Sequence, residues 1–121
     1  MYKYSFEKLD VWIIAKELVK IIYLQTKSFP SSEQFGLTNQ IRRSTISVAS
    51  NLAEGSSRKT KKEQARFTQI AYSSLMELLN QIIISFDLGF LTNKDYLHVR
   101  TEIEKLTLKI NALHKSQIIK K

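Results

Sequence analysis

Basic side chains are concentrated in one short segment of the chain. Five of them fall within nine consecutive positions, and two adjacent arginines precede these: Arg58, Lys59, Lys61, Lys62 and Arg66, with Arg42 and Arg43. Guanidinium and ammonium groups bind phosphate through charge-assisted hydrogen bonds, so these residues are candidates for contacting the backbone of RNA or DNA. The alternative is an ordinary solvated loop. Since Phe67 is the one aromatic residue nearby, base stacking is not predicted.

The charge of the whole chain agrees with an anionic partner. Lysine and arginine number 19 against 11 aspartate and glutamate residues, which gives a formal net charge of +8. Such a charge attracts polyanions, of which nucleic acid is the commonest; an acidic protein or an anionic membrane surface also fits. The apolar runs are far shorter than the roughly 20 residues that span a bilayer. The lack of cysteine, and of a signal-peptide pattern over Met1–Asp10, favours a cytoplasmic protein.

A strip of polar residues precedes the basic segment. Its members recur at steps of four, three, four and three, which places them on one face of a helix: Gln40, Ser44, Ser47, Asn51 and Glu54. Serine and asparagine suit close packing with hydrogen bonds to a neighbouring helix, and a strip facing a ligand is the alternative. Glu54 near a helix C-terminus opposes the helix dipole, so we expect it to have a partner at Arg58 or near Thr60.

No set of residues in the sequence is typical of an enzyme. The nearest match to the Glu-x-x-His pattern of di-metal bundles is Asp95 to His98, which occurs once, and His114 has Asn111 three positions before it. Glycine-rich phosphate loops are missing, and without cysteine there is no thiolate metal site. We therefore predict no catalytic residue, no metal and no cofactor.

Four helices can be predicted from the spacing of apolar residues. The chain has 121 residues with only three glycines and one proline, which fits a single domain (1–121) built of few, long elements. The predicted helices cover about 9–26, 38–54 and 60–88, and a fourth follows Thr92. Short connections make consecutive helices antiparallel neighbours. The predicted fold is therefore all-α, an up-down-up-down antiparallel four-helix bundle.

Residues with known capping preferences mark the expected helix ends. Thr38, Thr60 and Thr92 are predicted N-caps, and Thr60 begins a capping-box pattern that ends at Glu63. Gly55 is predicted to end the second helix in the left-handed conformation, and Gly89 to close the third.

The third helix carries more apolar residues than one bundle core requires. They form two adjacent stripes, Phe67, Ala71, Leu75, Leu78, Ile82 and Phe86 beside Tyr72, Met76, Leu79 and Ile83. Either this is the central helix of the bundle and is covered on two sides, or one stripe is a subunit interface.

Several segments together resemble a known family. They are FEKLDVW (6–12), FGLTNQIRRSTISVASNLAEGSSR (35–58), RFTQIAYSSLMELLNQI (66–82) and LGFL (88–91). The sequence is similar to the bacterial four helix bundle proteins, which are encoded in intervening sequences of 23S ribosomal RNA genes. That family is related to the accessory variability determinant of diversity-generating retroelements, a basic barrel that binds nucleic acid and a reverse transcriptase.

The resemblance implies a four-helix protomer that assembles into a ring-like homopentamer. Carried over by position, its signature residues are Gln40, Arg43, Ser47, Asn51, Glu54, Gly55, Ser74 and Glu77. Together with the charge, it predicts a non-enzymatic, oligomeric nucleic-acid-binding protein linked to 23S rRNA intervening sequences. The alternative is a protein-interaction scaffold, or an accessory subunit for an acidic or polymerase-like partner.

Overall fold

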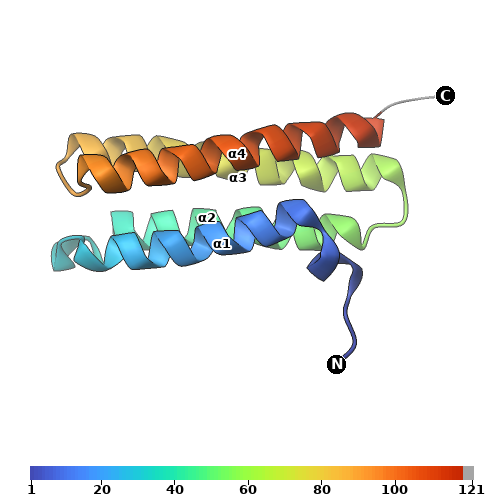
Figure 1. The fold of residues 1–121 in the computed structure, drawn as a ribbon, viewed down its shortest axis with the longest axis horizontal. Coiled ribbons are helices and arrows are strands. Elements are labelled where there is room, and N and C mark those ends of the chain that lie inside the picture. Colours follow the sequence, from blue (N-terminus) through green and yellow to red (C-terminus); the bar gives the residue numbers. More distant parts are fainter. Residues whose placement is uncertain (119–121) are drawn as a thin grey trace.

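Four long helices make up most of the computed structural model, which describes residues 1–118. They are α1 (Asp10–Gln25), α2 (Leu37–Ser56), α3 (Lys61–Asp87) and α4 (Asn93–Ile118). Consecutive helices run in opposite directions, with α1 and α2 in one layer and α3 and α4 in the other (Figure 1). Each helix packs against two neighbours, because α1 also contacts α4. The predicted up-down-up-down bundle is confirmed; residues 119–121 of the predicted domain lie outside the described range.

One short 3₁₀ helix precedes α1, and two more lie between α1 and α2. They are η1 (Ser5–Lys8), η2 (Thr26–Ser28) and η3 (Ser31–Glu33). Between η2 and η3, Phe29 and Pro30 break the helix as expected, since the residue before proline avoids the helical conformation. None of the helices within residues 1–118 is both long and apolar enough to cross a membrane.

The core consists of the apolar positions that recur at steps of three and four. Each long helix contributes residues that are almost completely buried, among them Leu18, Ile22, Ile41, Val48, Leu75, Leu78, Ile82, Val99, Ile103, Leu106 and Ile110. Three buried hydroxyls, those of Thr45, Thr68 and Ser85, donate to the backbone carbonyl oxygen one turn earlier, as in the 2.8 Å bond from Thr45 to Ile41. Among residues 1–118, the buried side-chain polar atoms without a hydrogen-bond partner belong to Gln25, Gln81, Arg100 and Gln117.

Three of the predicted helix ends are confirmed. The Thr60 hydroxyl accepts a 3.1 Å hydrogen bond from the Glu63 amide, and the Thr92 hydroxyl accepts one of the same length from the Asp95 amide. Gly89 closes α3 with a φ of +82°. The amides of Gly89 and Phe90 bond to the last carbonyls of that helix, which is the Schellman arrangement.

Two predicted helix ends are wrong. Thr38 is not an N-cap: α2 begins one residue earlier, where the Glu33 carboxylate accepts a 3.1 Å bond from the Leu37 amide. Gly55 is helical, because α2 continues to Ser56. A Cβ atom at Gly55 would lie 2.8 Å from the Cβ of Phe67. The glycine therefore allows α2 and α3 to approach each other closely.

The second apolar stripe of α3 is partly buried within the protomer. Tyr72, Met76 and Leu79 pack against the core, and Ile83 is also half-buried. Since α3 packs against both α2 and α4, this burial favours the interpretation of α3 as a central helix covered on two sides.

Candidate nucleic-acid interface

The turn between α2 and α3 brings five of the predicted basic residues to one end of the bundle. All five are exposed, namely Arg58, Lys59, Lys61, Lys62 and Arg66. The turn lies at the same end as the N-terminus and the last residues of α4 (Figure 1). Among residues 1–118, only Arg58 of these five forms an ion pair, in which its Nη1 lies 3.9 Å from Glu63 Oε1. The turn therefore presents a concentrated positive charge.

Two of the five basic residues at the turn stack on an aromatic ring. The Cζ atoms of Arg58 and Arg66 lie 5.2 and 5.3 Å from the centre of the Phe67 ring, within the range of cation–π attraction. The Gln64 side-chain amide also donates a 2.9 Å bond to the Arg58 carbonyl oxygen, which fixes the turn. The sequence predicted Phe67 only as a core residue. Its position directly after Arg66 is the one signal that could have indicated this second role.

The structure does not bring Arg42 and Arg43 to the turn. They lie in the first half of α2, about 20 Å from its C-terminal end at 1.5 Å per residue. Arg42 is half-buried, its Nε donates a 2.9 Å bond to Thr26 Oγ1, and its guanidinium lies 4.5 Å from the Tyr23 ring centre. Arg42 therefore joins α1 to α2. Arg43 is exposed on a different face.

The polar strip of α2 packs against α3. Ser47 Oγ and Ser74 Oγ are hydrogen-bonded at 2.8 Å, and the Asn51 side-chain amide donates to the carbonyl oxygen and the hydroxyl of Ser47 at 2.8 and 3.1 Å. This is the helix-to-helix packing expected of small polar residues. At its exposed end, Gln40, Arg43 and Glu77 surround a shallow hollow of about 240 Å³. Six of the signature residues therefore lie at the contact between α2 and α3. Ser47, Asn51 and Ser74 form its hydrogen bonds, and Gln40, Arg43 and Glu77 border the hollow.

The expected partner of Glu54 is not found. Glu54 is exposed, and within residues 1–118 it forms no ion pair. Arg58, the predicted partner, instead lies beside Glu63 in the first turn of α3. The prediction is wrong because Glu54 lies exposed at the C-terminal end of the polar strip, whereas the chain turns at Ser57 toward the start of α3.

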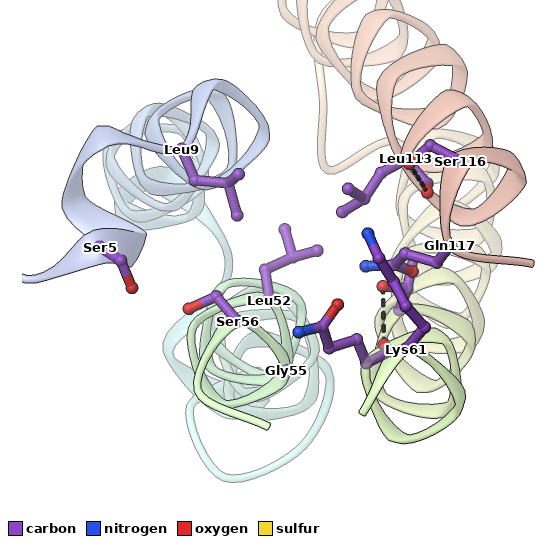
Figure 2. A pocket seen from close by; sticks show the side chains of 11 residues that line it. Ser5, Leu9, Leu52, Gly55, Ser56, Lys61, Leu113, Ser116 and Gln117 are labelled. Carbon is purple, nitrogen blue, oxygen red and sulfur yellow. Dashed lines mark hydrogen bonds between the residues drawn. The ribbon is translucent and has the colours of Figure 1, made fainter. Parts of the chain in front are cut away.

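A cavity of about 220 Å³ opens at the same end of the bundle. Side chains of η1, of the residue before α1 and of α2, α3 and α4 surround it, and Leu9, Leu52 and Leu113 face one another across its apolar side (Figure 2). Lys61 belongs both to this cavity and to the basic turn. Gln117 adds a buried side-chain oxygen that has no hydrogen-bond partner within residues 1–118. Among residues 1–118, the polar side chains that line the cavity are those of serine, threonine, glutamine and lysine.

The two histidines both lie on α4. His98 is exposed on α4, and His114 is half-buried further along the same helix. Over residues 1–118, no group of three or more His, Asp or Glu side chains gathers in a way that could hold a metal ion.

Known proteins share the fold and the sequence pattern. The chain is similar to the crystal structure of a protein with unknown function from the S23 ribosomal protein family of Bacteroides thetaiotaomicron. The TM-score is 0.78 at 18% sequence identity, over 87% of this chain and 95% of that one, and this likeness shows a shared fold. No match was found among curated protein sequences. The model of the 23S rRNA-intervening sequence protein family matches residues 7–112, and the chain therefore belongs to that family.

Proposed function

We propose that this protein is a cytoplasmic, non-enzymatic nucleic-acid-binding protein that contacts the phosphate backbone through its α2–α3 turn. The observation that carries the proposal is the gathering of five exposed basic side chains at this turn, of which only one has a recorded carboxylate partner within residues 1–118. Membership of the 23S rRNA-intervening sequence protein family supports structured RNA as the first nucleic acid to test.

The helix geometry of the turn adds to the attraction of its side chains. The turn is also the N-terminus of the 27-residue α3, where unpaired amides and the helix dipole favour anions. The opposite end of the bundle is more balanced, since the cations Lys27, Arg42 and Lys94 there are accompanied by Glu33, Asp87 and Asp95. A polyanion is therefore steered toward one end of the molecule.

The proposal includes self-association. The family resemblance implies a homopentamer, and a ring would bring five copies of the basic turn together. Ile70 and Ile84 on α3 are 37% and 42% exposed, and the hollow between Gln40, Arg43 and Glu77 offers polar groups of both signs to a second copy. Light scattering of the purified protein measures the number of copies directly; a monomer at working concentrations would refute this part of the proposal.

The decisive experiment is a salt-dependent titration of structured RNA and duplex DNA. Each phosphate neutralised adds to the slope of log affinity against log salt, so a four-fold variant (Arg58, Lys59, Lys61 and Lys62 to Ala) should bind more weakly and with a shallower slope. The matched control replaces four exposed lysines away from the turn: Lys20, Lys27, Lys94 and Lys105. Both variants lose the same charge, so only a position-specific contact separates them.

Two results would contradict the proposal in different ways. If the two variants weaken binding equally, the attraction comes from net charge alone and the turn is not the contact surface. If the unmodified protein does not bind RNA or DNA even at low salt, the proposal fails, and an acidic protein becomes the expected partner of its basic surface. That partner would then be sought as a complex that survives nuclease treatment.

A further inference from the structure

Phe67 occupies a fixed position because α2 has a glycine opposite it. A Cβ atom at Gly55 would meet the Phe67 Cβ at 2.8 Å and its Cγ at 3.7 Å, so the backbone of α2 lies directly against the Phe67 side chain. Phe67 is half-buried there and keeps part of its ring at the surface of the basic turn. The ring is thereby a rigid platform at the base of flexible charged side chains.

Two guanidinium groups from different elements use this platform. Arg58 comes from the turn and Arg66 from α3, and their Cζ atoms lie 5.2 and 5.3 Å from the same ring centre. Their separation therefore cannot exceed these two distances added together. The pair is therefore close enough to contact neighbouring phosphates of one strand.

The lysines of the turn lack any comparable support. Within residues 1–118, Lys59, Lys61 and Lys62 show no ion pair, and none of them stacks on an aromatic ring. An ammonium group on a free four-carbon stem is a mobile point charge, whereas a guanidinium presents a planar fork that can bind one phosphate through two hydrogen bonds. An arginine already held over a ring loses less freedom when it binds.

We infer that Arg58 and Arg66 form an organised phosphate-binding pair on Phe67, and that Lys59, Lys61 and Lys62 supply attraction without fixed geometry. This inference rests on the proposed function. Phe67 is a positioning residue in it, and Gly55 makes its position available. The Glu63 carboxylate, 3.9 Å from Arg58, is an exposed and therefore weak competitor that a phosphate can displace.

Conservative substitutions distinguish the contribution of guanidinium geometry to RNA binding from the contribution of positive charge. R58K/R66K keeps both positive charges but removes the forks and their stacking, and K59R/K62R is the matched control. With a structured RNA hairpin as the probe, R58K/R66K should lower the affinity on the order of tenfold while the salt slope stays unchanged. K59R/K62R should bind within about twofold of the unmodified protein, because charge is all that those lysines contribute.

A variant of the platform provides an independent measurement. F67L keeps an apolar side chain against α2 but removes the aromatic face, so it should weaken RNA binding several-fold in protein whose helical circular dichroism is unchanged. If RNA binds but R58K/R66K binds as tightly as the unmodified protein, the organised pair is refuted while the proposed function stands. If the unmodified protein binds no RNA, the proposed function fails first and the inference fails with it.

Discussion

The hydroxyl oxygens of Ser47 on α2 and Ser74 on α3 lie 2.8 Å apart and join the two helices across the middle of their contact. Asn51 extends this link, because its side-chain amide donates to both the carbonyl and the hydroxyl oxygen of Ser47. Three of the signature residues are thus linked in one small network. We infer that they set the register of α2 against α3, and with it the position of the turn that follows.

Ser74→Ala should lower the free energy of unfolding by about 1 kcal/mol, because the Ser47 hydroxyl loses its partner on α3 at a site that is largely closed to water. Urea denaturation followed by circular dichroism measures the change. Ser73→Ala is the control, since Ser73 is the exposed neighbour on the same helix and alanine favours helix there. Equal stability of the two variants would mean that the hydroxyl pair contributes nothing.

Gly55→Ala should destabilise the protein by about 1–3 kcal/mol, although alanine is the better helix former. The added Cβ would lie 2.8 Å from the Phe67 Cβ, so α2 and α3 must move apart. Ser50→Ala, on the exposed side of the same helix, should change the stability by less than about 0.5 kcal/mol. A Gly55→Ala protein as stable as the original would show that the close approach of the helices is not needed.

Glu63→Gln should strengthen RNA binding about twofold to threefold, because it removes the carboxylate 3.9 Å from Arg58 and adds one unit of positive charge to the turn. Glu104→Gln is the control for net charge, since Glu104 lies 4.0 Å from Arg100 on α4. Filter-binding or fluorescence titration at one fixed salt concentration compares the two. The same gain in both variants would count against the turn as the contact surface.

Arg42→Ala should lower stability by about 1–2 kcal/mol, because it removes the bond to Thr26 and the stacking on Tyr23. Its effect on RNA binding should be no larger than that of Arg43→Ala, which removes an exposed neighbour of the same charge. Thermal unfolding and RNA titration of both variants check the two halves of this prediction. A specific loss of RNA affinity in Arg42→Ala alone would return that residue to the contact surface.

Local signals in the sequence were sufficient for most of the fold. Thr60, Thr92 and Gly89 act through amides and carbonyls within a few positions of themselves, and the structure confirms all three. The roles of Thr38 and Gly55 were predicted from the same capping preferences, but other contacts determine how α2 begins and why position 55 is a glycine. Glu33 reaches forward to cap α2, and Phe67 from the next helix requires a glycine at position 55.

The candidate site was harder to predict because residues that are consecutive in the sequence lie on different faces of a helix. Arg42 and Arg43 are consecutive, yet a step of 100° turns one toward Tyr23 and the other toward the hollow beside Glu77. The cluster of Arg58 and Arg66 could be predicted because a turn keeps it local. Its use of Phe67 could not, because the periodicity that identifies a core residue does not indicate which part of the ring stays at the surface.

The N-terminus and the last residues of α4 lie at the same end of the bundle as the basic turn (Figure 1). An affinity tag or fluorescent protein fused to either terminus would therefore stand next to the proposed contact surface and compete with RNA for it. The α3–α4 turn at the far end is the better place for a reporter. Because the sequence has no cysteine, Lys94→Cys would give a single attachment point for a dye there, where a bound RNA leaves the label undisturbed.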